Sequence, residues 1–343
     1  MYQFFIMKIL LTGGLGFIGS HTALALNEKH YETVIVDNLS NSKKEVYNTI
    51  QTLCQEPDLL QFYEGDVTNK PFLNLVFQEE KPDAVIHFAS LKSVKDSIED
   101  PYSYYYQNLN GLLSILETMK IHNCNRIVFS SSATVYGENQ KAPLYESMQI
   151  GQHITNPYGQ TKYFQEVILQ DYSKANPELN VLLLRYFNPV GAHESGLLGE
   201  DPNGIPSNLF PFVMRVASGQ YEELQIFGND YDSKDGTCIR DFIHVMDLAE
   251  GHVASLKQDK PGCHVYNLGT GQGTTVLELV EAFEKTNQVV IPRNFQPRRC
   301  GDVDIVYSDA SKAKEELQWT TKRSLETICK DGYHFVTRQS KHH

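Results

Sequence analysis

The sequence predicts an α/β protein in which a parallel sheet is covered by helices on both faces and is followed by a smaller C-terminal α/β domain. Through the first half of the chain, short apolar runs alternate with longer amphipathic segments, as in repeating strand–helix units. The runs that predict strands span residues 8–11, 33–36, 61–64, 84–88, 127–130 and 181–186. After the first run, glycines stand at every third position before an apolar helical segment begins. Together these observations predict a Rossmann-like, doubly wound sheet.

Two long helices are expected, and the character of the chain changes after residue 188. Residues 102–122 and 158–175 each carry apolar side chains at helical spacing, and Pro157 stands at a favourable helix entry. We expect both apolar faces to pack on the sheet, although a share of either could form a dimer contact. Residues 189–211 are rich in Gly, Pro, Asn and Ser, so we expect a loop there and shorter elements beyond it. The predicted domains are 1–188 and 189–343, with about 239–257 returning to the first.

The composition of the 343 residues excludes several classes of protein. A formal net charge of −12 argues against a broad surface for nucleic acid or anionic membranes, although it leaves room for local arginines that bind a phosphorylated small molecule. The six cysteines are widely spaced and form no Cys-x-x-Cys pair, so we expect free thiols in the reducing cytoplasm and no metal site. Neither a membrane-length apolar run nor a signal peptide is expected.

The glycine-rich run at residues 12–20 predicts a binding site for a dinucleotide pyrophosphate. Gly13 permits a tight turn after the strand, Gly16 lets phosphates approach the backbone, and Gly19 lets the helix pack on the strand. Asp37 ends the next strand, where a carboxylate binds the adenosine ribose hydroxyls and repels a 2′-phosphate. NAD is therefore favoured, although Lys43 and Lys44 are close enough to keep NADP open. A phosphate loop of the Gly-Lys-Ser/Thr type is excluded because no such run follows the glycines.

Residues at the carboxyl ends of the predicted strands, where ligands of parallel sheets bind, predict a reaction centre. The strand ends include three serines at 130–132, and a Tyr-x-x-x-Lys pair, Tyr158 and Lys162, opens the following helix. Residues four apart share a helix face, and a nearby ammonium favours the phenolate of a tyrosine whose free pKa is about 10. Each feature alone also fits a structural role, such as an exposed pair or a polar strand end. The three together, after a dinucleotide loop, are more specific.

Six runs resemble the motifs of the extended short-chain dehydrogenase/reductase family, and within it those of the UDP-glucose 4-epimerases. They are TGGLGFIGSH at 12–21, HFA at 87–89, SSSATVYG at 130–137, YGQTK at 158–162, LRYFNPVGA at 184–192 and DFIHVMDL at 241–248. The resemblance extends from about residue 7 to residue 332, which is nearly the whole chain.

This resemblance implies an NAD-dependent isomerase that interconverts UDP-glucose and UDP-galactose through a 4-keto sugar. It implies that Tyr158 removes the proton of the sugar 4-hydroxyl, that Lys162 holds the nicotinamide ribose and lowers the pKa of the tyrosine, and that Ser132 bridges substrate and phenol. Hydride passes to tightly bound NAD, the sugar swings about its link to the diphosphate, and the hydride returns to the other face. The nucleotide must therefore be held while the sugar turns.

The resemblance also implies which residues contact the two ligands. The cofactor contacts are Gly13, Gly16, Phe17, Ile18, Gly19, Asp37, Asn38, Asn41, Ser42, Asp66, Val67, Phe88, Ala89, Lys92, Asn108, Ser132, Tyr158, Lys162 and Phe187. The UDP-sugar contacts are Lys92, Ser132, Tyr158, Asn188, Asn208, Leu209, Phe227, Arg240, Arg299, Asp302 and Val306. Arg240 and Arg299 are assigned to the diphosphate, whose geometry suits guanidinium groups, although either alone could be a surface charge.

Val306 lies where some 4-epimerases carry a bulky tyrosine beside the sugar. Members of the family with a small residue there tend to accept N-acetylated sugars. Our hypothesis is that Val306 leaves room for an acetamido group, so that UDP-GlcNAc and UDP-GalNAc are also substrates. The alternative is that Val306 merely packs and the loop closes around it.

Three other functions are weighed against the epimerase. Nucleotide-sugar 4,6-dehydratases usually carry an Asp-Glu pair just after the serine/threonine strand end, where this chain has Ala133, Thr134 and Val135. A net dehydrogenase would release NADH at each turnover. A catalytically idle NAD-binding regulator is disfavoured because the catalytic serine, tyrosine and lysine are all present. The resemblance further implies a homodimer, formed through the two long helices.

Overall fold

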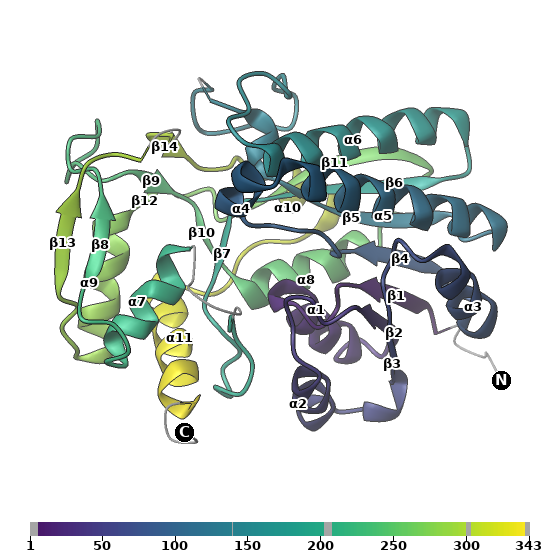
Figure 1. Cartoon of the computed structure of the whole chain (residues 1–343), viewed down its shortest axis with the longest axis horizontal. Coiled ribbons are helices and arrows are strands. Elements are labelled where there is room, and N and C mark those ends of the chain that lie inside the picture. Colours follow the sequence, from purple (N-terminus) through teal and green to yellow (C-terminus); the bar gives the residue numbers. More distant parts are fainter. Residues whose placement is uncertain (1–5, 139, 202–207, 300–302, 340–343) are drawn as a thin grey trace. The chain divides into compact units, whose positions relative to one another are not determined.

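The structure, a computed structural model, describes residues 6–138, 140–201, 208–299 and 303–339. The chain forms two compact units (Figure 1). The first comprises Met1–Val135, Asn156–Arg185 and Ala249–Tyr266, and the second comprises Tyr136–Thr155, Tyr186–Leu248 and Asn267–His343. As compact units the two parts interleave along the chain, so a single cut at residue 188 does not separate them. The domain boundaries drawn from the sequence stay a prediction.

A seven-stranded sheet organises the first unit, in the order β11-β6-β5-β4-β1-β2-β3 (Figure 1). The pairs of β3 with β2, β2 with β1, β1 with β4 and β4 with β5 are parallel. The predicted doubly wound parallel sheet is confirmed. The strands are β1 (Lys8–Thr12), β2 (Glu32–Asp37), β3 (Leu60–Glu64), β4 (Ala84–His87), β5 (Arg126–Ser132), β6 (Asn180–Tyr186) and β11 (Gly262–Leu268).

Helices cover both faces of this sheet because each strand carries apolar side chains on both sides. On one face, α3, α5 and α6 enclose a core that includes Leu10, Val85, Leu116, Phe129 and Leu169. Figure 1 shows α1 and α8 on the other face. The bounds are α1 (Phe17–Asn27), α2 (Glu45–Leu53), the 3₁₀ turn η1 (Pro57–Leu59), α3 (Lys70–Glu80), α4 (Val94–Glu99), α5 (Pro101–Ile121), the 3₁₀ turn η2 (Ala133–Tyr136), α6 (Pro157–Ala175) and α8 (Val245–Ser255).

The second unit is built from short strands and three packed helices. Strand β7 pairs with β10, β8 pairs with β13, and β9 lies between β12 and β14. A separate core forms where α7, α9 and α11 bring Phe210, Phe283 and Ile328 together. The bounds are β7 (Asn188–Val190), α7 (Leu209–Ala217), β8 (Leu224–Phe227), β9 (Ile239–Arg240), β10 (Phe242–His244), β12 (Thr274–Thr275), α9 (Val276–Asn287), β13 (Arg293–Gln296), β14 (Ile305–Val306), α10 (Ser311–Leu317) and α11 (Leu325–Gln339).

The six predicted strands and both predicted long helices are confirmed to within a few residues. The seventh strand, β11, was not predicted, and it joins the sheet beside β6 from far along the chain. The predicted loop at 189–211 begins inside the short strand β7 and reaches α7, and its residues 202–207 lie outside the described part of the chain.

Candidate active site

The glycine loop after β1 has no room for a side chain at two positions, and at the first of them its φ is also positive. Gly13 has a φ of +67°, and a Cβ there would lie 2.7 Å from the amide nitrogen of Ala89. A Cβ at Gly19 would lie 2.4 Å from the carbonyl oxygen of Gly13. Gly16 then caps the N-terminus of α1. The loop therefore presents bare backbone and a helix N-terminus at the carboxyl edge of the sheet, which fits a dinucleotide pyrophosphate.

Asp37, at the end of β2, binds the same loop through its carboxylate. Its carboxylate accepts hydrogen bonds from the backbone N–H of Leu15 and of Leu39, each at 3.0 Å, and from the Ser42 hydroxyl at 2.8 Å. Carboxylate oxygens have further lone pairs, so ribose hydroxyls can still donate to them. Lys44, one of the two lysines that kept NADP open, lies 3.6 Å from the carboxylate of Glu64. The arrangement fits the ribose of NAD better than a 2′-phosphate.

Asp66 and Asn38 form a second polar cluster beyond the ends of β2 and β3. Asn38 donates to Asp66 at 2.8 Å, and Thr68 donates to it through both its backbone N–H and its hydroxyl. Burial raises the pKa of Asp66, but these hydrogen bonds and one from Gln107 outweigh burial and lower the pKa. Asp66 is therefore an ionised hydrogen-bond acceptor, which suits the polar edge of an adenine or a ribose.

Asn108, a predicted cofactor contact, is held in place by hydrogen bonds within the protein. Both of its amide N–H groups are used, one by the carbonyl of Leu91 at 3.1 Å and the other by the hydroxyl of Thr161 at 2.9 Å. Its oxygen accepts from the N–H of Leu91 at 2.8 Å. Asn108 thus fixes the segment after β4, which carries the predicted ligand contact Lys92, to helix α6.

Ser132, Tyr158 and Lys162 are brought together as the sequence predicts. Ser132 is the last residue of β5, and α6 starts beside it with Asn156 capping the N–H of Gly159 at 2.8 Å. Ser132 hydrogen-bonds the phenol of Tyr158. The buried ammonium of Lys162 donates to the carbonyl of Ser130 at 2.7 Å and lies 5.9 Å from the centre of the Tyr158 ring. Hydroxyl, phenol and ammonium therefore lie close to one another at the carboxyl edge of the sheet.

Burial controls the pKa values of the tyrosine–lysine pair. It raises the pKa of Tyr158 to about 12, and the hydrogen bond with Ser132 lowers it only in part. Burial also lowers the pKa of Lys162 to about 7. Burial is the largest cause of both shifts. That Lys162 lowers the pKa of the tyrosine stays a prediction.

A buried ion pair next to these residues was not predicted. Arg185, in β6, binds Glu166 with two parallel hydrogen bonds, at 2.9 Å from Nε and 2.7 Å from an Nη atom. Ser131 donates its hydroxyl to the same carboxylate. Glu166 follows Lys162 by one helical turn, so the pair ties α6 to the strand end that carries Ser132. The signal in the sequence for a buried ion pair is the presence of an arginine within the apolar run 181–186.

The second unit contains the predicted UDP-sugar contacts other than Lys92, Ser132 and Tyr158, which belong to the first unit. The Arg299 guanidinium lies 3.7 Å from the centre of the Phe227 ring, a cation–π contact. Val306 of β14 pairs directly with Arg240 of β9. Asn188 starts β7, while Asn208 and Leu209 stand at the start of α7. Phe187 is buried. The predicted contact Asp302 lies outside the described residues.

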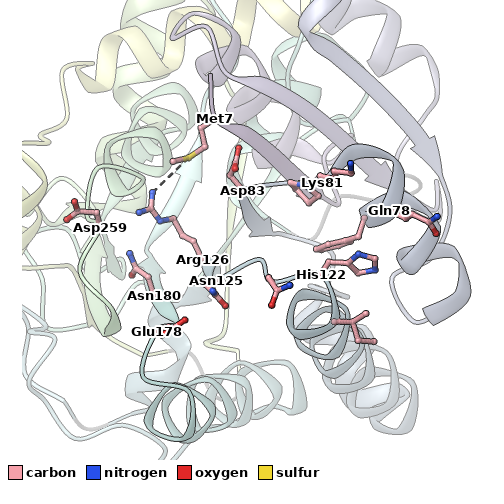
Figure 2. Close-up of a pocket in the computed structure, with 14 residues that line it drawn as sticks. Met7, Gln78, Lys81, Asp83, His122, Asn125, Arg126, Glu178, Asn180 and Asp259 are labelled. Atoms are coloured by element: carbon pink, nitrogen blue, oxygen red, sulfur yellow. Dashed lines mark hydrogen bonds between the residues drawn. The ribbon is translucent and has the colours of Figure 1, made fainter. Parts of the chain in front are cut away.

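A cavity of about 720 Å³ lies at the opposite edge of the seven-stranded sheet (Figure 2). Among its lining residues, Met7 precedes β1, Asp83 precedes β4, and Arg126 and Asn180 open β5 and β6. These are the amino ends of the strands, whereas ligands of parallel sheets bind at the carboxyl ends. The cavity is therefore separate from the candidate site.

Among the described residues, no cluster of three or more His, Cys, Asp or Glu side chains could hold a metal ion. None of the helices in the described part of the chain has both the length and the apolar character needed to cross a membrane.

Known proteins resemble this chain over nearly its full length. The family model described as GDP-mannose 4,6 dehydratase matches residues 10–332. The UDP-glucose 4-epimerase of Bacillus subtilis (strain 168) is 50% identical over 329 residues, which cover 95% of this chain and 96% of that protein.

Solved structures agree with this likeness. The crystal structure of UDP-glucose 4-epimerase from Bifidobacterium longum in complex with NAD+ and UDP has a TM-score of 0.93 and 47% identity, and covers 97% of this chain and 99% of that one. The UDP-Glc/GlcNAc 4-epimerase from Campylobacter jejuni has a TM-score of 0.83 and 37% identity, covering 97% of this chain and 99% of that one.

Proposed function

We propose that this chain, which belongs to the family of UDP-glucose 4-epimerases and GDP-mannose 4,6 dehydratases, interconverts UDP-glucose and UDP-galactose with resident NAD. The observation that carries the proposal is the meeting of Ser132, Tyr158 and Lys162 at the carboxyl edge of the sheet. The relatives at about half identity are 4-epimerases, and one solved relative was crystallised with NAD+ and UDP. The glycine loop and Asp37 fit the same cofactor.

In this reaction the chain's own residues handle the proton and hold the ligands. The phenol oxygen of Tyr158, once ionised, accepts the proton of the sugar 4-hydroxyl and later returns it. Ser132 binds both that hydroxyl and the phenol. Lys162, whose ammonium donates to the carbonyl of Ser130, would bind the nicotinamide ribose. When bound, NAD takes a hydride from carbon 4 and gives it back, and its positive ring adds the attraction that a phenolate needs.

The nucleotide anchor is assigned to the second unit. Arg240 and Arg299 supply the guanidinium groups for the diphosphate, and the Arg299 group is positioned by its cation–π contact with the ring of Phe227. Asn188 and Asn208 are polar contacts at the starts of β7 and α7. A nucleotide held in this way leaves the sugar free to turn between the two hydride transfers.

A dehydratase is the nearest alternative, because the matching family model carries that description. Dehydration needs an acid and a base for carbons 5 and 6 of the sugar. The turn η2 follows Ser132 directly and begins with Ala133, Thr134 and Val135, none of which can transfer a proton. The epimerase is therefore favoured.

The test uses the purified protein with no cofactor added. We expect UDP-galactose to give UDP-glucose, resolved by chromatography, and we expect Tyr158→Phe to lose several orders of magnitude in turnover because the proton acceptor is gone. Turnover that survives this change would contradict the role of Tyr158, whereas no turnover by the wild-type protein would favour the catalytically idle NAD-binding regulator. Release of stoichiometric NADH would indicate a dehydrogenase, and a 4-keto-6-deoxy product would indicate a dehydratase.

N-acetylated sugars are proposed as additional substrates. Val306 is small and half-buried, and it faces Arg240 across the β9–β14 pair. A solved relative is named as a UDP-Glc/GlcNAc 4-epimerase. We expect Val306→Tyr to lose at least tenfold in kcat/KM for UDP-GalNAc and to keep UDP-galactose turnover. Val290→Tyr, at an 80% exposed position in the same unit, is the control. Equal survival of both activities would refute the role of Val306.

A homodimer is proposed through α5 and α6. Tyr102, Tyr106 and Leu113 are exposed on one face of α5. Phe164 of α6 is also exposed, and its ring contacts that of Tyr105 on α5. Such an apolar patch favours association. We expect light scattering to give a dimer mass, and Leu113→Glu to give a monomer.

Leu75→Glu is the control for this dimer, because Leu75 on α3 is 50% exposed and Leu113 is 46% exposed. A Leu113→Glu protein that stays dimeric would place the interface elsewhere. We further propose a cytoplasmic location, which the free thiols of Cys54, Cys124 and Cys329 support, since such thiols are typical of a reducing compartment.

A further inference from the structure

Asp241 is a fully buried carboxylate that collects five hydrogen bonds from two loops of the second unit. It accepts from the backbone N–H and the hydroxyl of Thr270, at 2.8 and 2.6 Å, and from the N–H of Gly271 at 3.2 Å. It also accepts from the N–H and the hydroxyl of Ser308, at 3.1 and 2.6 Å. A carboxylate is acceptor-only, so every donor that faces it is satisfied.

These hydrogen bonds join the strands that carry the proposed substrate residues. Asp241 directly follows Arg240 of β9, and Ser308 stands two residues after Val306 of β14. Strands β9 and β14 are neighbours in one small sheet, with Val306 opposite Arg240 (Figure 1). The backbone carbonyl of Asp241 also accepts the N–H of Asn188 at 2.9 Å. One residue therefore links three segments that carry substrate contacts.

The backbone at Gly269 packs closely against the carboxylate of Asp241. A Cβ on Gly269 would lie 2.4 Å from the Ser308 hydroxyl and 2.5 Å from a carboxylate oxygen of Asp241. The loop at 269–271 must therefore approach through its backbone. A change at Asp241 would be transmitted to Ser308 and the loop, rather than absorbed by a flexible side chain.

We propose that Asp241 is a positioning residue for the UDP-sugar: its carboxylate fixes Arg240 opposite Val306, and so sets the distance between the diphosphate anchor and the wall of the sugar site. The inference rests on the proposed function, because it concerns the same substrate residues. Asp241 is not one of the proposed ligand contacts, and its side chain acts through the two strands that it joins.

The test compares two buried aspartates of the same unit. Asp241→Asn keeps the shape but turns an N–H₂ group toward N–H and O–H donors, which leaves donors unsatisfied. Asp247→Asn is the matched control, because Asp247 is equally buried and accepts from the N–H of Lys322 and of Arg323. The control is expected to lose similar thermal stability without disturbing β9 and β14.

We expect Asp241→Asn to raise the Kd for UDP and the KM for UDP-galactose at least tenfold, with a smaller change in kcat and no change in the content of resident NAD. The turnover ratio of UDP-GalNAc to UDP-galactose is also expected to shift, since Val306 moves with its strand. Asp247→Asn should leave the UDP affinity and the ratio unchanged. Equal effects of the two variants on UDP affinity would overturn the proposal.

A milder variant covers the case in which Asp241→Asn does not fold. Ser308→Ala removes one hydroxyl from the carboxylate, and a few-fold rise in the Kd for UDP is expected. Combined with Asp241→Asn, where that protein folds, it should add little, because both changes break the same contact. An unchanged Kd in Ser308→Ala would count against the proposal. Failure of the wild-type protein to bind UDP would instead remove the proposed function, and with it this inference.

Discussion

The buried pair of Glu166 and Arg185 allows a sharp test of how the catalytic strand end is held. The side chains are 0% and 3% exposed and share two hydrogen bonds. Removing one partner of such a pair leaves an unpaired buried charge and costs about 3–5 kcal/mol of unfolding free energy. We therefore expect Arg185→Met and Glu166→Leu each to destabilise the protein by that amount.

The double variant is expected to recover most of this loss. With both charges replaced by apolar groups of similar volume, no unpaired charge stays buried, and the Ser131 hydroxyl loses its acceptor, which costs about 1–3 kcal/mol. The coupling energy of the cycle is then at least about 3 kcal/mol. Urea unfolding followed by circular dichroism measures each value. Asp171→Asn is the control, because its pair with Lys174 lies exposed on the same helix.

The same variants report on catalysis. Ser131 precedes Ser132, and Glu166 lies one turn beyond Lys162, so loss of the pair displaces catalytic groups. A displacement of about 1 Å can lower turnover about 100-fold. We expect kcat to fall in the single variants while the Kd for UDP, assigned to the second unit, stays unchanged. Additive losses of stability in the double variant, or an undiminished kcat in the folded single variants, would refute the reasoning.

Three further changes have expected outcomes. Gly13→Ala should lose resident NAD, because the new Cβ would lie 2.7 Å from the amide nitrogen of Ala89 at a φ of +67°. Absorbance after denaturation measures the NAD content, and retention of NAD would contradict the strain argument. Burial, followed by the charge of Lys162, lowers the pKa of His87 to about 3. Between about pH 3 and 6.5 the unfolded state therefore binds a proton that the folded state does not. As the pH falls through this range, the free energy of unfolding should decrease by about 1.4 kcal/mol per pH unit more in the wild type than in His87→Gln. Equal slopes in urea titrations at pH 4–6 would refute that assignment. Phe227→Leu should weaken UDP binding about threefold to thirtyfold through loss of the ring under Arg299, and calorimetry that shows no change would place Arg299 away from the diphosphate.

The sequence predicts those features of the fold whose cause is local. Buried strands, the glycine turn and the Tyr-x-x-x-Lys spacing each follow from neighbours a few residues apart, and the structure confirms the strands and both long helices. Strand β11 escaped prediction because its half-buried first residues give no continuous apolar run, and its place beside β6 depends on a return of the chain. The pKa of Tyr158 also could not be predicted, since burial, and not charge spacing, dominates it.

The positioning roles that the sequence misses share one property, which is that they belong to buried polar groups with partners far away in the chain. Asn108 reaches Thr161 across 53 residues, Glu166 reaches Ser131 across 35, and Asp241 reaches Ser308 across 67. Each touches a segment that bears a predicted ligand contact, so each can change activity without touching a ligand. Loss of activity on mutating a predicted site residue therefore does not by itself identify a catalytic group. Separate measurements of kcat, UDP affinity and NAD content are needed, because a displaced strand and a missing proton acceptor affect them differently.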